Sequence, residues 1–213
     1  MKIALFGANG HLGSAILQES LQRGHAVIAV ARDPQRLTVD HPKLSVVTGN
    51  AGDSASFIGA VAGCDVVIAS LSGRRDADAS SVPRYARVLL DALPRAGVGR
   101  LIWVGGAGSL ETSSGVRIID DAAFPAAWKP AALAQADALQ VFRTTDAAID
   151  WTYVSPAPVI EAGARSGRYR IGGDQVLVDA DGVSRITIAD YAAAVIDRVE
   201  QDDAKCTRIT VAY

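Results

Sequence analysis

The sequence predicts an α/β fold: a single domain over residues 1–213 with a doubly wound, mostly parallel sheet and helices on both faces. Three observations support this prediction. Apolar strand-like runs alternate with amphipathic helical segments along most of the chain. The strand-like runs are apolar almost throughout, which is typical of strands that are buried on both faces. The length of 213 residues suits one sizeable core and is short for two domains.

The elements follow one another in a regular order. The expected strands are 2–6, 26–30, 44–48, 65–70, 101–104, 151–154 and 208–211. The expected helices are 14–23, 54–61, 82–96, 131–145 and a last one that Thr187 caps. This last helix carries one apolar face at the spacing i, i+3, i+4, i+7, made of Ala192, Val195, Ile196 and Val199. We therefore expect it to pack that face against the sheet.

A glycine-rich turn joins the first strand to the first helix. Gly7, Gly10 and Gly13 follow the spacing G-x-x-G-x-x-G. Such a turn places unpaired backbone N–H groups and a helix N-terminus at one point, which suits a pyrophosphate. The second strand, 26–30, completes the strand–helix–strand unit that this motif requires. The sequence thus predicts a dinucleotide site; the alternative is a turn whose glycines serve only backbone conformation and helix packing.

The end of the second strand indicates which dinucleotide binds. An acidic residue there would accept hydrogen bonds from the adenosine ribose, whereas an arginine accommodates a 2′-phosphate. This chain has Arg32 at that point, with Arg36 one turn further on. NADP is therefore favoured over NAD, and the alternative for Arg32 is a solvated surface charge. Asp33 is interpreted as an N-cap, with Pro34 at the first helical position.

Composition and charge narrow the possible partners. The net charge is −2 with no basic stripe, so we expect no nucleic acid partner. No apolar run has the length of a membrane span and the chain starts with a strand, so we expect no membrane association and a cytoplasmic protein. Cys64 and Cys206 are far apart and the three histidines are scattered, which predicts no metal site. The sequence leaves open whether the protein is a monomer or a homodimer.

Two long segments interrupt the alternation of strands and helices. We name residues 105–130 the first wall segment and residues 156–186 the second wall segment. Both begin at the carboxyl end of an expected strand, and ligands of doubly wound sheets bind beyond those ends. Long irregular segments within a compact domain are often functional. We therefore expect the two segments to form the walls of a substrate pocket.

Several segments resemble those of a known family. The matching segments are GANGHLG from Gly7, VARDPQRL from Val30, VGGAGSLE from Val104, FPAAWKPAALAQADAL from Phe124, WTYVSPA from Trp151 and GRYRIGGDQVLVDADGVSRIT from Gly167. They resemble the atypical short-chain dehydrogenase/reductases, in the NAD(P)H-binding group related to NmrA and biliverdin reductase B. Within that group the chain is similar to the NADH-flavin reductases. The resemblance implies a Rossmann-type subunit that binds NAD(P)H and passes hydride to a flavin, a quinone or another small planar acceptor.

The same resemblance implies the residues that contact the cofactor. They are Gly7, Asn9, Gly10, His11, Leu12 and Gly13 at the pyrophosphate, Arg32 at the adenosine end, Asn50 beside the adenine, Ser70 and Leu71 at the ribose, and Ser155 and Pro156 near the nicotinamide. Relatives commonly have aspartate where this chain has Asn50, so the charge at that position is lost while a hydrogen-bonding side chain is kept.

The catalytic group of short-chain dehydrogenases is missing. Those enzymes use a Tyr-x-x-x-Lys pair, and none of the five tyrosines here has a lysine four residues later. Gly105 and Gly106 stand where a catalytic serine is common. Flavin reduction needs chiefly proximity and orientation, so it is compatible with this loss. We expect Lys129 to bind or polarise the acceptor, Ser109 to donate a hydrogen bond near the nicotinamide, and Trp128 to stack on a planar acceptor. The alternatives are a surface lysine, a loop cap and a packing tryptophan.

Two other functions remain open. An NmrA-like regulator would bind NAD(P) as a redox signal without turning it over, and the missing Tyr-x-x-x-Lys pair favours it. A sugar-nucleotide epimerase is less favoured, because such an enzyme needs that tyrosine and a larger C-terminal domain.

Overall fold

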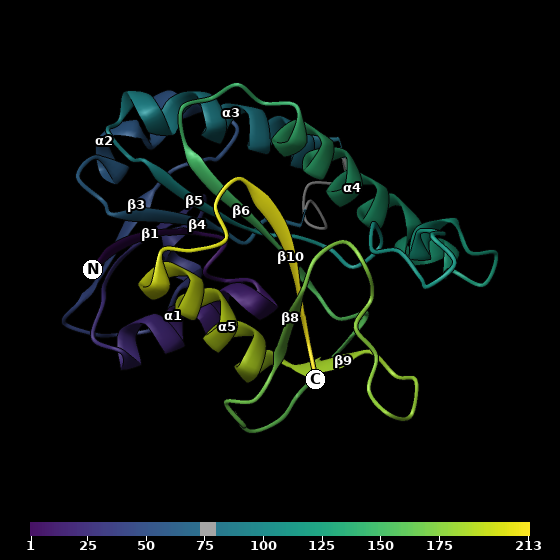
Figure 1. Ribbon diagram of the computed structural model, residues 1–213. Coiled ribbons are helices and arrows are strands. Elements are labelled where there is room, and N and C mark those ends of the chain that lie inside the picture. The colour runs from purple at the N-terminus through teal and green to yellow at the C-terminus, as the bar shows by residue number, and fades with distance from the viewer. Residues whose placement is uncertain (73–79) are drawn as a thin grey trace.

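The computed structural model describes residues 1–72 and 80–213, and a twisted sheet runs through the middle of the molecule (Figure 1). In the described residues this sheet has eight strands, in the order β3-β2-β1-β4-β5-β6-β10-β8. Their bounds are β1 Lys2–Phe6, β2 Ala26–Ala31, β3 Leu44–Thr48, β4 Val66–Ala69, β5 Arg100–Val104, β6 Asp150–Pro156, β8 Arg170–Gly172 and β10 Thr207–Ala212. Every pairing is parallel except that of β10 with β8. The fold prediction of a doubly wound, mostly parallel sheet is confirmed.

The strand order reverses at β1. From β1 the chain builds outward through β2 to β3, and then returns to add β4 on the other side of β1. Phe6, the last residue of β1, is therefore paired with Val30 of β2 on one side and with Ala69 of β4 on the other. Ligands of doubly wound sheets bind in the crevice beyond the strand ends at this point of reversal. The glycine turn, which begins at Gly7, lies there.

Helices cover both faces of the sheet (Figure 1). Helix α1 (His11–Gln22) packs beside α5 (Ile188–Gln201) on one face, and α3 (Ser81–Arg95) packs beside α4 (Lys129–Arg143) and the short α2 (Ile58–Val61) on the other. Side chains of the sheet and of the helices form two hydrophobic clusters of buried residues, one between the sheet and each helix layer. Side chains of β1 alternate between them, with Ile3 in one and Ala4 in the other, which explains why the strands are apolar throughout. Across residues 1–72 and 80–213, no helix combines the length and apolar character needed to cross a membrane.

The ends of several helices are set by local sequence. Thr187 caps α5 as predicted, because its side chain accepts a hydrogen bond from the Asp190 N–H. The first helix begins three residues earlier than expected, at His11, since Gly10 already serves as its N-cap. The expected helix 54–61 is interrupted at Phe57, which separates the 3-10 turn η2 (Ser54–Ser56) from α2.

The irregular segments contain further short elements. The first wall segment carries two 3-10 turns, η3 (Ile118–Asp120) and η4 (Ala126–Trp128), and its last two residues already belong to α4. The second wall segment carries β8 and β7 (Val159–Glu161), and it reaches β9 (Arg185–Thr187), which pairs with β7. Another 3-10 turn, η1 (Pro34–Arg36), follows β2, with Asp33 and Pro34 at the predicted N-cap and first positions. The Asp33 side chain, however, makes no capping hydrogen bond there.

Candidate functional site

Two glycines of the turn are required by packing. Gly7 has φ +81°, and a Cβ added to it would lie 2.0 Å from the carbonyl oxygen of Ser70. A Cβ on Gly13 would lie 2.0 Å from the carbonyl oxygen of Gly7. These glycines let the turn approach the end of β4 and let α1 approach the turn. The purely structural interpretation thus accounts for Gly7 and Gly13.

Gly10 differs from both of them. Its φ of −80° and ψ of 165° are open to any residue, and the nearest atom to an added Cβ is the carbonyl oxygen of Gly7, at 3.1 Å. As the N-cap it has no side chain to pair with the first N–H groups of α1, and the first turn of α1 has no acidic residue. Those N–H groups, on His11, Leu12 and Gly13, have no partner within the helix, and the positive end of the helix dipole adds to them. The geometry fits a pyrophosphate, with room at Gly10 for its close approach.

The predicted ribose residues follow β4, and the first of them lies directly against the glycine turn. Ser70 follows β4, and its N–H donates to the carbonyl of Phe6 at 2.9 Å, so β4 ends level with β1. The Leu71 carbonyl accepts a hydrogen bond of 2.7 Å from Gln135 Nε2 on α4. This bond anchors the residues that leave β4 to the helix layer. Both residues are half-buried, and the Ser70 carbonyl lies against Gly7.

The predicted adenosine residues lie beyond the next two strands. Arg32 directly follows β2 and is exposed, and Asn50 follows β3 by two residues. The Asn50 side chain has a local task, because its Oδ1 accepts the Gly52 N–H at 3.0 Å. Asparagine performs this turn-forming role without charge. Arg32 and Asn50 thus follow the carboxyl ends of β2 and β3, at the same edge of the sheet as the glycine turn.

The predicted nicotinamide residues end β6, which runs two residues further than expected. Ser155 and Pro156 are buried, and Ser155 Oγ accepts a hydrogen bond of 3.3 Å from Arg208 Nη1. Ser109 lies nearby, since its carbonyl accepts from the same guanidinium at 3.5 Å. The Ser109 hydroxyl is buried, with the residue 9% exposed, and it has no hydrogen-bond partner within the described residues.

The remaining candidates lie at the start of α4. Lys129 is the first residue of that helix and is exposed, and Trp128 just before it is 61% exposed. Core packing therefore does not account for Trp128. Arg117 lowers the pKa of the Asp120 carboxyl, and Lys129 adds a smaller effect in the same direction. Helix α4, which Lys129 begins, contacts η3 within the first wall segment.

A buried polar network was not predicted. Gln135 accepts from Trp103 Nε1 at 3.1 Å through its side-chain oxygen, and its backbone carbonyl accepts the Tyr153 hydroxyl at 2.9 Å. That hydroxyl in turn accepts from the Gly106 N–H at 3.2 Å. The only sequence signal for this network is a glutamine on an otherwise apolar helix face. The network joins α4, β5 and β6 close to the carboxyl ends of the two strands.

Tyr153 also explains the missing serine. A Cβ on Gly105 would lie 2.0 Å from Tyr153 Cε1, so a serine cannot occupy that position beside this ring. Burial raises the pKa of the Tyr153 hydroxyl well above its usual value, so the group stays protonated. It donates to a backbone carbonyl rather than toward a ligand. Tyr153 does not replace the absent catalytic tyrosine.

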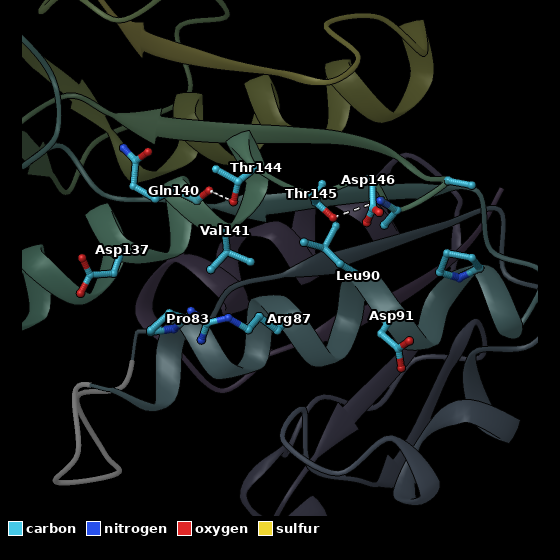
Figure 2. Close-up of a pocket in the computed structure, with 13 residues that line it drawn as sticks. Pro83, Arg87, Leu90, Asp91, Asp137, Gln140, Val141, Thr144, Thr145 and Asp146 are labelled. Carbon is cyan, nitrogen blue, oxygen red and sulfur yellow. Dashed lines mark hydrogen bonds between the residues drawn. The ribbon is translucent and has the colours of Figure 1, made fainter.

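Two surface hollows lie away from these residues. The larger, of about 730 Å³, runs between α3 and α4, where Arg87 and Val141 line opposite sides (Figure 2). The smaller, of about 540 Å³, is lined by residues 167–170 together with Asp197 and Tyr213. Neither includes a residue predicted to bind cofactor or acceptor.

Comparison with known proteins places the chain in a family. Residues 7–198 match a family model described as NAD(P)H-binding. The chain is similar to the structure of a "putative exported protein" from Burkholderia pseudomallei, with 40% identity, a TM-score of 0.89 and 100% of both chains covered. A "putative epimerase" from Bacteroides thetaiotaomicron has 35% identity and a TM-score of 0.90, with 100% of this chain and 96% of that chain covered. A "putative NADH-flavin reductase" from Streptococcus pneumoniae TIGR4 has 30% identity and a TM-score of 0.87, with 100% and 99% covered. The chain therefore belongs to the NAD(P)H-binding family.

Proposed function

We propose that this protein is an NADPH-dependent reductase that passes hydride to a flavin or a similar small planar acceptor. The observation that carries the proposal is the N-terminus of α1, capped by Gly10 without a side chain, at the point where the strand order reverses. The family match supports a nicotinamide cofactor there. When bound, this cofactor supplies the hydride.

The residues around the turn suit the phosphates of NADPH. The first N–H groups of α1 would hold the pyrophosphate, and the exposed guanidinium of Arg32 would contact the 2′-phosphate. A charge-assisted hydrogen bond to a phosphate is stronger than a neutral one, and this favours NADPH over NADH.

The acceptor is inferred from what the site lacks. Reduction of a carbonyl needs a positioned proton donor, yet Gly105 replaces the usual serine and the Tyr153 hydroxyl is turned to a backbone carbonyl. Hydride transfer between two stacked planar rings needs mainly orientation. Trp128 would stack on such an acceptor and the charge of Lys129 would attract it. Ser109 would donate a hydrogen bond to it. The similar protein from Streptococcus pneumoniae, named a putative NADH-flavin reductase, supports this acceptor class.

The alternative functions are weaker. A regulator that binds NADPH without turnover is favoured by the same missing proton donor, and it predicts tight binding with no oxidation of NADPH. An epimerase is suggested by the similar protein from Bacteroides thetaiotaomicron. An epimerase would need the tyrosine of a Tyr-x-x-x-Lys pair, which this chain lacks.

Steady-state oxidation of NADPH with FMN, FAD and quinones tests the proposal. The wild type should oxidise NADPH with at least one of these acceptors, and a Gly10→Val variant prepared in parallel should not. Tight NADPH binding with no turnover on any of them would favour the regulator.

A further inference from the structure

A buried arginine on β10 connects both wall segments to the sheet. Arg208 is 6% exposed, and its Nε donates to Asp174 Oδ1 at 2.6 Å, in the second wall segment. Its Nη2 donates to the carbonyl of Ser109 at 3.5 Å, in the first wall segment. Its Nη1 donates to Ser155 Oγ at 3.3 Å, near the end of β6. One guanidinium thus contacts three parts of the predicted acceptor site.

The two wall segments also contact each other at the same place. The Glu111 N–H donates to the carbonyl of Asp174 at 2.9 Å, and the Val176 N–H donates to the carbonyl of Glu111 at 2.8 Å. Arg208 Nη2 donates to that same Asp174 carbonyl at 3.2 Å. The arginine therefore holds both the side chain and the backbone of the residue at which the walls meet.

The contacts of Arg208 depend on the shape and the donors of a guanidinium group. Its planar fork presents five N–H donors, so it can hold a carboxylate, a carbonyl and a hydroxyl at once, whereas a lysine acts as a single point charge. Asp174 gives this buried charge an ion-pair partner. The further bonds fall on Ser109 and Ser155, the two serines that the sequence assigns to the nicotinamide end. Arg208 holds the Ser109 carbonyl, whereas the buried Ser109 hydroxyl has no hydrogen-bond partner within the described residues.

We propose that Arg208 is a positioning residue for hydride transfer. It holds the two wall segments against the end of β6 and thereby fixes Ser109 and Ser155 relative to the nicotinamide and the acceptor. This inference rests on the proposed function, and it does not involve the pyrophosphate turn at Gly10.

The test compares Arg208→Met and Arg208→Lys with a matched control, Arg100→Met. Arg100 is also 6% exposed, but it begins β5, three register positions nearer the amino ends of the strands than Arg208, and it donates to the carbonyls of Asp150 and Asp203. For each variant, four quantities are measured well below its Tm: NADPH affinity, kcat and KM with FMN (or whichever tested acceptor the wild type reduces), and amide hydrogen exchange in 105–117 and 170–177. If Arg208→Met does not fold, Arg208→Lys and Asp174→Asn carry the comparison.

Arg208→Met should lower kcat about ten- to a hundredfold, as expected for a small displacement of reacting groups. Arg208→Lys should recover part of this loss, and both variants should accelerate exchange in the two wall segments. NADPH affinity should stay within about threefold, because the pyrophosphate turn is independent of Arg208. Arg100→Met should lower Tm but keep kcat and the exchange of the walls.

Equal kcat values for wild type and Arg208→Met, or an equal loss in Arg100→Met, would overturn the positioning role. A wild type without turnover would instead contradict the proposed function. The exchange measurements would then still decide whether Arg208 holds the walls, and unchanged exchange in Arg208→Met would show that it does not.

Discussion

Gly105 lies against the ring of Tyr153, so closely that an added Cβ would be 2.0 Å from Tyr153 Cε1. The residue type at position 105, after β5, therefore depends on the Tyr153 side chain of β6, and the ring position depends on glycine at 105. Glycine leaves space for the ring, and the ring excludes the serine that related dehydrogenases have at this point. The missing catalytic serine is thus a consequence of packing around Tyr153, whose hydroxyl belongs to the network of Gln135.

A double-mutant cycle tests this relationship. Gly105→Ser should destabilise the protein by about 1–3 kcal/mol, because the site is already full. The same change in a Tyr153→Leu background should cost markedly less, since the ring atoms that collide are gone. Urea unfolding of the four proteins gives the coupling energy. Strictly additive effects would show that the Tyr153 ring is not what excludes a side chain at position 105.

Arg32 should determine the preference between cofactors. Arg32→Ala should weaken NADPH binding by about 1.5–3 kcal/mol, roughly tenfold or more, and should leave NADH binding nearly unchanged. Calorimetric titration with both cofactors measures this, and Arg36→Ala, in the neighbouring turn η1, is the control. Equal losses for the two cofactors in Arg32→Ala would argue against a contact with the 2′-phosphate.

Lys129 should act on the acceptor and not on NADPH. Lys129→Ala should lower kcat/KM for the anionic acceptor FMN, because an attractive charge beside the site is removed. The affinity for NADPH should change by no more than about twofold. Lys43→Ala is the matched control, since Lys43 is an exposed lysine whose Nζ donates to the carbonyl of Gly24, away from the predicted site. Unchanged kinetics in Lys129→Ala would show that Lys129 is an ordinary surface charge with no role at the acceptor.

The buried carboxylate of Asp190 predicts how stability depends on pH. Burial alone raises the pKa of Asp190, but hydrogen bonds from Tyr213, Ser166 and Gly167 outweigh it and lower the pKa below the usual value. The contribution of Asp190 to stability is therefore fully present above the unfolded-state pKa of about 3.9 and is lost as the pH falls through the lower folded-state pKa. Thermal unfolding of wild type and Asp190→Asn from neutral to acidic pH measures this. The difference in Tm should be largest near neutral pH and shrink below about pH 4, whereas a constant difference would contradict the prediction.

Much of the fold could be predicted because its strands are buried on both faces. The run Lys2–Phe6 is buried from Ile3 to Phe6 and is followed directly by the glycine turn, so its expected limits agree with the structure. The three-residue strands β7 and β8 could not be predicted, since they are too short to show a period and are largely exposed. Their position depends on pairing with β9 and β10, which local sequence does not encode.

The candidate site divides in the same way. The glycine turn could be predicted because its backbone requirement is local and only glycine meets it at Gly7. Arg208 could not be recognised, because a single arginine at the start of an apolar strand gives no sign of a partner 34 residues away. The sequence shows Gln135 as a polar residue on an otherwise apolar helix face. It does not show the hydrogen-bond partners of Gln135, because Trp103 and Leu71 belong to distant parts of the chain.

The N-terminus of α1 is the central claim, and NADPH affinity in a Gly10→Val variant tests it most directly. The φ and ψ of Gly10 are open to valine, whose Cβ would make one tight contact of 3.1 Å with the carbonyl oxygen of Gly7. The variant should therefore stay folded with a lowered Tm. Its side chain would occupy the space that the pyrophosphate needs. Gly13→Val is the contrasting variant, because its Cβ would lie 2.0 Å from the carbonyl oxygen of Gly7 and should disrupt the fold itself. Calorimetry should show NADPH binding to the wild type and none to a folded Gly10→Val protein; unchanged affinity in that variant would contradict the account.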